Sequence, residues 1–431
     1  MNILLIHQYA GNKGDRAVLF AMCSMIKSVD NSINISVSTS SPELWTGYGY
    51  YKEQQIEFIP SAWNYKNIVK ARWYWNSINR IKKYTFTVMR ECYLHHCSWL
   101  VTRFLINPIF YKRIKAADVI ISVGGHHFTT ILSRDLVSSI NFDAMAILSV
   151  GKKLSCFSQS FGPFVFFNIR NRILTQKILQ ECTSLYVREN RARQYLVQLG
   201  IPDAKIKDTY ESVLSLNSLF KSYKYPSERE KRIGIAIYST QLKEENRESY
   251  IECFSLFANY VIKKGYSVRF FPMELKGSLP DDRPVILDII KRVDNKTYCD
   301  FIDKDLPTDV HLQEVSKCQI FVGHKTHSTI FALATGTPLI GIAYHPKTEE
   351  FMKQFSIPQY CIIDKELSSK SLIRKFDNIE LEIDQIGESL FNQVCAVYKR
   401  DNICKIKIFC LILFFFGLFQ LYLLLLFMPM A

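Results

Sequence analysis

Short apolar runs alternate with segments of helical periodicity along most of this chain of 431 residues, and no other feature limits its fold as much. A buried strand followed by an amphipathic helix is typical of parallel sheets with crossover helices. The runs fall in two groups, separated by a polar stretch of turn composition at 221–231. We therefore predict two α/β sheets in tandem, with strands near 3–7, 33–38, 119–123, 154–158 and 185–187, and near 233–238, 268–271, 320–322 and 339–343.

Segments of helical periodicity fill the spaces between these runs. The two sheets predict an N-terminal domain over residues 1–222 and a C-terminal domain over residues 230–398. Each is long enough to bury a core, since domains typically hold about 150 residues. A hydrophobic share of 48% excludes a disordered chain. The clearest predicted helices lie at 16–29, 141–150, 247–264, 285–293 and 328–334.

One segment, residues 61–115, does not fit the alternation and carries most of the positive charge. Its eleven basic residues face a single acid, Glu91, so it holds +10 of the chain's +14, and it contains four of the five tryptophans. Basic residues interleaved with aromatic rings suit a helix in the headgroup layer of a membrane. A helical insertion that packs its aromatic rings on the first sheet is one alternative, and a nucleic-acid groove is another.

The stretch at 408–430 contains no charged residue and one strongly polar residue, Gln420. About 20 such residues cross the ~30 Å hydrocarbon core of a bilayer as a helix. We predict a membrane helix at 406–430, with a buried C-terminal helix as the alternative. The segment at 399–407 has a net charge of +3, which predicts that the body lies at the cytoplasmic face of the cell membrane. The membrane is therefore the expected partner of both basic segments, and nucleic acid is not.

The twelve cysteines form no C-x-x-C pair, and several lie in apolar runs, as expected for core residues in a reducing compartment. The stretch from Cys92 to Cys97 also contains two histidines, but no second cluster completes a tetrahedral set of ligands. We therefore expect no metal site and no cofactor.

Glycine-bearing loops follow three predicted strands of the first domain. In an open parallel sheet, ligands bind beyond the carboxyl ends of the strands, where glycine lets backbone N–H groups approach an anion. Asp15 is equally suited to cap the helix that follows the first loop. The candidate binding residues are Gly11, Asn12, Gly14 and Asp15, then Gly124, Gly125 and His126 with His127 beside them, and then Ser160 and Gly162.

In the second domain, His324, Lys325 and His327 follow a buried strand and begin a helix. Two histidines and a lysine at a helix N-terminus can bind a phosphate or a carboxylate and move a proton near neutral pH. The sequence contains no hydrolase elbow, zincin or kinase motif. Six of the nine histidines fall at predicted carboxyl ends of strands, although a structural, hydrogen-bonded role explains any single one equally well.

Five motifs in consistent order resemble the polysaccharide pyruvyl transferase family. They are GNKGDRAVLFAM near the start, the glycine-rich turn at 124–125, SQSFGPF at 158–164, VREN at 187–190 and GHKTHSTIFALATGTPLIGIAYHPKTEEF at 323–351, the most specific of the five. The resemblance implies two Rossmann-like domains facing each other, as in B-type glycosyltransferases. It also implies transfer of the enolpyruvyl unit of phosphoenolpyruvate onto two sugar hydroxyls as a cyclic ketal.

The resemblance assigns roles to single residues. His327 aligns with the family's acid/base histidine. Lys325 stands where the family has an arginine that binds the phosphoenolpyruvate anion, so a lysine ammonium group, a point charge, replaces a planar guanidinium that can bind an anion through two hydrogen bonds. Arg188 is a second anion-binding candidate. His127 completes the expected catalytic set, and Tyr344, Lys347 and His324 are expected to line the same site.

We therefore expect a membrane-associated pyruvyl transferase that acts on a lipid-linked or surface polysaccharide and releases phosphate. Phosphoenolpyruvate is the expected donor and a glycan the expected acceptor. A B-type glycosyltransferase that uses a nucleotide sugar is the alternative within the same fold. An inactive membrane scaffold of polysaccharide assembly, indicated by Lys325 in place of arginine, is the alternative from another class.

Overall fold

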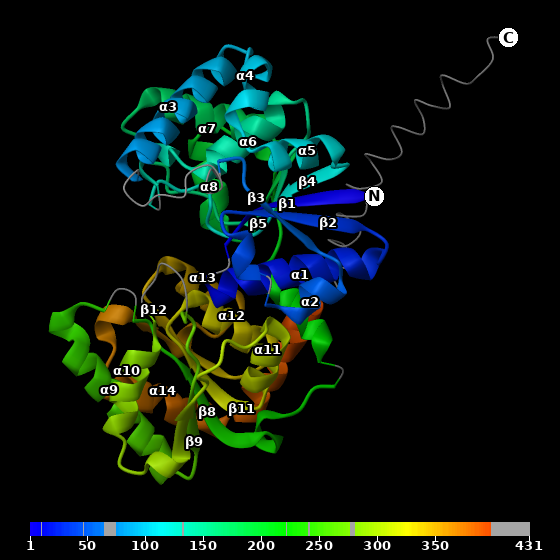
Figure 1. Cartoon of the computed structure of the whole chain (residues 1–431). Helices are drawn as coiled ribbons and strands as arrows, with labels where there is room; N and C mark the ends of the chain where they lie inside the picture. Colours follow the sequence, from blue (N-terminus) through cyan, green and yellow to red (C-terminus); the bar gives the residue numbers. More distant parts are fainter. Residues whose placement is uncertain are drawn as a thin grey trace. The chain divides into compact units, whose positions relative to one another are not determined.

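The structure, a computed structural model, describes residues 1–9, 11–45, 47–63, 75–131, 133–220, 222–239, 242–275 and 281–397, with the backbone alone at 75–80. These residues form two compact units (Figure 1). Within them, the first unit contains 1–9 and 22–211, and the second contains 11–21 and 212–397. The loop predicted to bind a ligand near residue 12 therefore belongs with the second sheet rather than the first.

The described residues of the first unit form a parallel sheet of seven strands with helices on both faces (Figure 1). All residues of the central strands β4 and β5 are buried, as is usual for a parallel sheet covered on both faces. The strand order is β3 (Glu57–Pro60), β2 (Asn34–Thr39), β1 (Asn2–Gln8), β4 (Val119–Ser122), β5 (Ser155–Gln159), β6 (Ser184–Val187) and β7 (Ile206–Asp208). The helices are α2 (Gly49–Glu53), α3 (Trp75–Leu94), α4 (Trp99–Leu105), α5 (Pro108–Ala116), α6 (Ser139–Ser149), α7 (Ile169–Glu181) and α8 (Asn190–Gln198). Helix α1 (Lys13–Val29) is shared, because its residues up to 21 belong to the second unit and the rest to the first.

The described residues of the second unit form a parallel sheet of six strands. Helices α9, α10 and α14 pack together, and α11, α12 and α13 pack together, with the sheet between the two groups (Figure 1). The strand order is β10 (Cys299–Phe301), β9 (Ser267–Phe270), β8 (Glu230–Ala236), β11 (Cys318–Gly323), β12 (Leu339–Ala343) and β13 (Cys361–Ile363). The helices are α9 (Glu244–Lys263), α10 (Arg283–Lys291), α11 (Thr308–Ser316), α12 (Thr326–Ala334), α13 (Pro346–Gln354) and α14 (Ser369–Leu381).

In both sheets the strand order reverses beside the first strand, between β1 and β4 and between β8 and β11. The loops at such a reversal leave in opposite directions, and open α/β sheets bind ligands in the crevice outside the carboxyl ends of these strands. The loops after β4 and β5 in the first unit, and the loops after β8 and β11 in the second, are therefore the ones that position a site. The loop after β1 belongs to the second unit.

In its described part, the segment at 61–115 is largely helical and packs on the first sheet. Trp63 stacks on Phe142 of α6, with ring centroids 5.1 Å apart, and Phe86 of α3 is buried in the same core. Residues 64–74 lie outside the described residues. The rings of Trp63 and Phe86 therefore pack in the core of the first unit, as expected for a helical insertion that packs on the first sheet.

The predicted fold class is wrong in one respect, the C-terminal membrane helix. No helix in the described part of the chain, which ends at residue 397, is long and apolar enough to cross a bilayer. The longest, α3 and α9, have 20 residues each, and both carry several charged side chains. The predicted span at 406–430 lies outside the described residues. The fold class that the described residues show is therefore two Rossmann-like α/β domains.

Candidate active site

The predicted catalytic residues of the second unit lie where β11 passes into α12. All six residues of β11 are buried, and the strand ends at Gly323. Lys325 occupies the N-cap position of α12 in an extended conformation, and His327 lies in the first turn of the helix. The positive end of the helix dipole is therefore next to both side chains, which favours an anion at this point.

His327 lies directly against Gly14, which is in the first turn of α1. A Cβ atom on Gly14 would come within 2.0 Å of the imidazole Cγ and Nδ1 atoms of His327, so no side chain fits at this position. Asn12 Oδ1 accepts a hydrogen bond of 2.6 Å from the Gly14 backbone, and Asn12 Nδ2 donates one of 2.9 Å to Glu274 Oε1. The loop at 11–15 is therefore anchored beside the N-terminus of α12.

Lys325 is paired with two buried carboxyl groups. Its Nζ lies 3.4 Å from Glu274 Oε1 and 3.4 Å from Asp282 Oδ2. The ammonium group also lies 5.3 Å from the centre of the Tyr238 ring, where a cation–π attraction is worth about 1 kcal/mol. With both carboxyl groups ionised, this cluster has an excess of one negative charge, which opposes an incoming anion.

The two carboxyl groups differ in their hydrogen bonds. Asp282 Oδ2 accepts from the backbone N–H groups of Met273 and Glu274, both at 2.9 Å, and Oδ1 accepts from the Ser239 hydroxyl at 2.5 Å. Burial, the largest effect, raises the pKa of Glu274 to about 7, although the charge of Lys325 opposes it. Glu274 is therefore positioned to exchange a proton near neutral pH.

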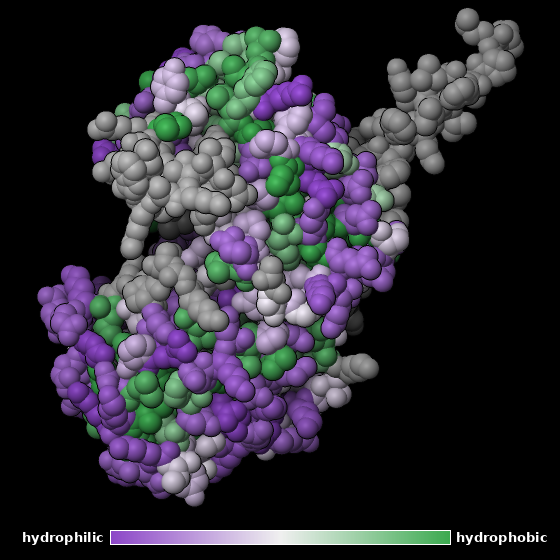
Figure 2. Space-filling model, in the orientation of Figure 1, coloured by the Kyte–Doolittle hydropathy of each residue, from purple (hydrophilic) through white to green (hydrophobic). Residues whose placement is uncertain are grey.

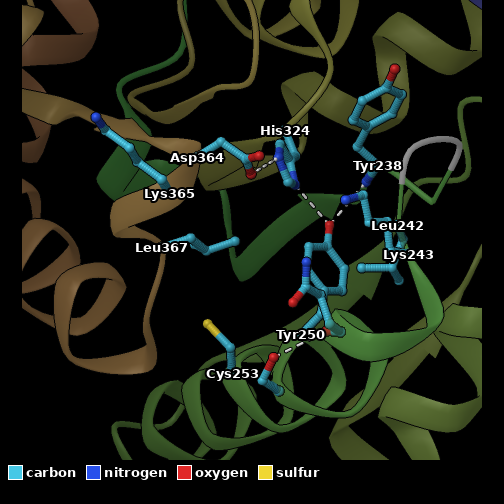
Figure 3. Close-up of a pocket in the computed structure, with 11 residues that line it drawn as sticks. Tyr238, Leu242, Lys243, Tyr250, Cys253, His324, Asp364, Lys365 and Leu367 are labelled. Carbon is cyan, nitrogen blue, oxygen red and sulfur yellow. Dashed lines mark hydrogen bonds and ion pairs between the residues drawn. The ribbon is translucent and has the colours of Figure 1, made fainter.

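A pocket with a volume of about 430 Å³ lies at the carboxyl ends of β8, β11 and β13 (Figure 3). The His324 ring lies between Tyr250 and Asp364, with Nδ1 2.7 Å from the Tyr250 hydroxyl and Nε2 2.8 Å from Asp364 Oδ1. The hydrogen bond to His324 lowers the pKa of Asp364, so the carboxylate accepts from Nε2–H and Nδ1 accepts from the tyrosine. Both ring nitrogens are thus engaged, and His324 shapes the pocket without offering a nitrogen to a ligand.

The remaining wall of the pocket is mostly polar. Tyr344 and Lys347 do not line it. The Tyr344 ring centroid lies 4.3 Å from that of Tyr238, and Lys347 lies in the first turn of α13, where its backbone N–H donates to His345 Nδ1 at 3.3 Å. The other residues that line the pocket are Tyr238, Leu242, Lys243, Asn246, Ser249, Cys253, Lys365 and Leu367.

Two basic residues in the first turn of α1, Lys13 and Arg16, were not among the sequence-based candidates. The Arg16 guanidinium pairs with Asp305 at 2.6 Å, and Lys13 Nζ lies 3.4 Å from His311 Nδ1. Burial is the main reason why the pKa of Lys13 is lowered to about 8. These contacts join positions almost 300 residues apart, so no local signal in the sequence could have indicated them.

In the first unit, the loops after β4 and β5 are bonded to each other. Gly125 has a φ of 153°, and a Cβ atom there would lie 2.4 Å from His127 Nε2. The carbonyl of Gly125 accepts a hydrogen bond of 2.9 Å from the Ser160 backbone, and the ring Nε2 of His126 bonds the carbonyl oxygen of Gly162. The absence of a side chain at Gly125 therefore leaves room for the His127 ring.

His7, at the end of β1, is a further buried histidine beside these loops. Its backbone has a φ of 67°, Nδ1 lies 2.7 Å from the Ser122 hydroxyl, and its ring centroid is 5.7 Å from that of His127. Burial lowers the pKa of His7, and the neighbouring His127 lowers it further. His7 is therefore uncharged at neutral pH.

Arg188 is enclosed by carboxylates of the first unit. Its guanidinium pairs with Glu211 and, at 3.5 Å, with Glu189, and its Nε donates to the Ser160 hydroxyl at 2.9 Å. Arg188, just after β6, therefore links Ser160, just after β5, to Glu211, the last described residue of the first unit.

The structure thus sorts the predicted site residues into two groups. The second unit brings Asn12, Gly14, Lys325 and His327 together, with Gly11 and Asp15 on the same loop and His324 and Tyr344 by the pocket. Glu274 and Asp282 join this group, although no sequence motif indicated them. The residues of the first unit are Gly124, Gly125, His126, His127, Ser160, Gly162 and Arg188.

Comparisons with known proteins extend over nearly the whole chain. The chain is similar to the amylovoran biosynthesis protein AmsJ of Erwinia amylovora, with 22% identity over 439 positions that cover 95% of this chain and 98% of AmsJ. Among solved structures it is similar to a putative UDP-N-acetylglucosamine 2-epimerase from Listeria monocytogenes, with 11% identity, a TM-score of 0.56 and coverage of 91% of this chain and 90% of that one. A UDP-GlcNAc 2-epimerase from Neisseria meningitidis gives 12% identity, a TM-score of 0.56 and coverage of 93% and 99%. At these identities, the likeness to solved structures shows the fold alone.

The family comparison is more specific than the fold. The model of a family described as polysaccharide pyruvyl transferase matches residues 12–346. The match begins in the loop that contacts His327 and includes Glu274, Lys325 and the whole of α12. It confirms the resemblance carried by the five motifs, and the chain belongs to the polysaccharide pyruvyl transferase family.

Proposed function

We propose that the protein transfers the enolpyruvyl group of phosphoenolpyruvate to two hydroxyls of a glycan, as a cyclic ketal, and releases phosphate. Membership of the family makes the protein a transferase of polysaccharide biosynthesis. The donor, the lipid-linked state of the acceptor and the residue roles are the proposal. The observation that carries it is the meeting of His327, Lys325 and the N-terminus of α12 with Gly14 in one unit.

The proposed reaction needs an acid, a base and positive charge. His327 gives a proton to the methylene carbon of the donor, which becomes a methyl group, while the first sugar oxygen bonds C2 and loses its proton to a base. The second sugar oxygen then bonds C2. At the same time the bond between C2 and the phosphate oxygen breaks, and phosphate leaves with the electron pair of that bond. The two hydroxyl protons balance those gained by the carbon and the phosphate. We expect no metal or cofactor.

Lys325 and the dipole of α12 are the proposed holders of the donor's anionic groups. A lysine binds an anion as a point charge and lacks the bidentate geometry of arginine. We therefore expect Lys325→Arg to change the KM for phosphoenolpyruvate more than kcat. The roles proposed for Arg188 and His127 stay predictions.

The pocket in Figure 3 is the proposed seat of the acceptor's sugar. Amide, hydroxyl and carboxylate groups from Asn246, Ser249 and Asp364 line it, together with the aromatic ring of Tyr238. Sugar hydroxyls need donors and acceptors of this kind, and about 430 Å³ is within the usual range for a small-molecule site.

The test is phosphate release from phosphoenolpyruvate by the purified full chain with a lipid-linked oligosaccharide, together with the mass of the glycan. We expect ketal formation that depends on both substrates, and a loss of at least about 100-fold in kcat for His327→Ala. His95→Ala, at an exposed histidine that follows α3, is the matched control. Full activity of His327→Ala would contradict the proposal.

The two alternatives predict other ligands. A glycosyltransferase would be protected against thermal unfolding by a nucleotide sugar and not by phosphoenolpyruvate. If the protein is an inactive scaffold, neither the wild type nor the Lys325→Arg variant would form a ketal. The family match favours pyruvyl transfer over both.

We also propose that α4 docks on the surface of an anionic bilayer. Trp99 and Phe104 are 65% and 83% exposed, with Leu100 and Arg103 on the same helix, and Figure 2 shows hydrophobic surface gathered over α4. Aromatic rings with a neighbouring cation suit the headgroup layer. No disulfide joins any two of the ten cysteines in the described part of the chain, which supports placing the docking on the cytoplasmic leaflet.

Sedimentation with vesicles tests this docking. Vesicles that contain phosphatidylglycerol should bind the wild-type chain, and the double variant Trp99→Ser, Phe104→Ser should bind more weakly. Phe167→Ser, at a phenylalanine of the first unit that is 72% exposed, is the control and should bind like the wild type. Equal binding of all three proteins would refute a role for α4.

A further inference from the structure

Glu274 is a buried carboxyl group that shares one lysine with a second buried carboxyl group. The side chains of Glu274 and Asp282 are 3% and 0% exposed, and each has an oxygen 3.4 Å from Lys325 Nζ. Two acidic groups so close together, with one cation between them, are costly to keep ionised away from water. One of the two is therefore expected to bind a proton more readily than an ordinary carboxyl group.

The hydrogen bonds decide which carboxyl group takes the proton. Both oxygens of Asp282 accept from N–H or O–H donors of Met273, Glu274 and Ser239. The Oε1 atom of Glu274 accepts from Asn12 Nδ2 at 2.9 Å, whereas Oε2 accepts no hydrogen bond from any residue that the structure describes. Oε2 of Glu274 is therefore the oxygen with room for a proton.

We propose that Glu274 is a positioning residue of the donor site, and that it takes up a proton when a carboxylate or phosphate group pairs with Lys325. The inference rests on the proposed function, because it takes Lys325 as the site of the donor's anion. With Glu274 protonated, the cluster of Lys325, Glu274 and Asp282 is neutral. The incoming anion then meets the lysine and the dipole of α12 without an excess of negative charge.

The charged groups that face Glu274 agree with this role. Lys325 lowers the pKa of Glu274, whereas Asp282 and Asp15 raise it. Burial has the largest effect, and the resulting pKa is about 7. A neighbouring anion adds to the effect of the two aspartates, so donor binding should drive proton uptake at pH 8.

Three further titratable groups surround this cluster. Burial raises the pKa of Tyr238 and of Tyr344, so neither tyrosine loses its proton between pH 7 and 9. Lys13, in the same unit, has a pKa of about 8 because of its burial. Lys13 and His327, the proposed proton donor, are the rival sources of a pH dependence, so the experiment must separate them from Glu274.

Calorimetric titration of the full chain with phosphoenolpyruvate, in buffers of different ionisation enthalpy, measures the proton uptake directly. At pH 8 we expect the wild type to take up close to one proton per donor bound, and its Kd to rise about tenfold per pH unit from pH 8 to pH 9. Glu274→Gln imitates the protonated group, so it should show no uptake and a constant Kd. Glu382→Gln, at an exposed glutamate of the same unit, should behave like the wild type.

Infrared difference spectra give a second measurement, which needs only the wild-type protein. Donor binding at pH 8 should produce the C=O band of a protonated carboxyl group. Binding without this band or without proton uptake would overturn the role of Glu274 and leave the donor assignment intact. Uptake that persists in Glu274→Gln would overturn it in favour of Lys13 or His327. If phosphoenolpyruvate does not bind at all, the proposed function fails, and this inference fails with it.

Discussion

Glu274 should make the folded protein less stable as the pH rises, and the size of the effect follows from its pKa. Burial raises this pKa from its ordinary value of 4.5 to about 7. The folded state therefore keeps the proton up to about pH 7, while the unfolded chain releases it near 4.5. The contribution to stability is fully present below 4.5 and is lost as the pH rises through 7. At 1.36 kcal/mol per pKa unit, the full loss is about 3 kcal/mol.

Glu274→Gln removes the titrating group and keeps the shape of the side chain. The free energy of unfolding of the variant, relative to that of the wild type, should rise by about 2.5 kcal/mol between pH 5 and pH 8. Urea unfolding of both full chains at each pH, followed by fluorescence, measures this difference. Glu382→Gln should give a difference that does not change with pH. If the Glu274→Gln difference is also constant, Glu274 has an ordinary pKa in the folded protein, and the reasoning is wrong.

Three further predictions concern the loops and the chemistry. Gly14→Ala should lower kcat at least about tenfold, because a Cβ atom would displace the His327 ring, whereas Gly47→Ala, with open space around it, should leave steady-state kinetics unchanged. Glu211→Ala should cost about 3 kcal/mol in urea unfolding, because it removes a carboxylate from the buried Arg188, and an unchanged midpoint would contradict this. Dialysis against a chelator should leave phosphate release unchanged, and a loss restored by a divalent cation would refute catalysis without a metal.

The interior of both sheets could be predicted from the sequence, but their edges could not. The nine predicted strands correspond to β1, β2, β4, β5, β6, β8, β9, β11 and β12. The strands that were missed, β3, β7, β10 and β13, are the edges of the two sheets. Each has three or four residues, of which one is buried, so it lacks the continuous apolar run that a strand buried on both faces shows.

The sequence likewise predicted some residues of the candidate site and missed others. Loops that combine glycine with histidine or lysine after a strand could be predicted, because a backbone close to an anion needs those residue types. Glu274 could not, because a single acid after β9 resembles an ordinary loop residue. Only the fold brings it within 2.9 Å of Asn12, which is 262 positions away. His324 lines the pocket, as its position after β11 predicted, but the sequence could not show that both its nitrogens bond the protein.

Pyruvyl transfer through His327 is tested most directly by the mass of the acceptor glycan after incubation with phosphoenolpyruvate in D₂O. We predict a pyruvate ketal whose methyl group carries one deuterium, because C3 receives its proton from a group that exchanges with solvent. The same product should be absent with His327→Ala and present with His95→Ala. A glycan that gains a sugar unit, or that gains no pyruvate, would contradict the proposed function.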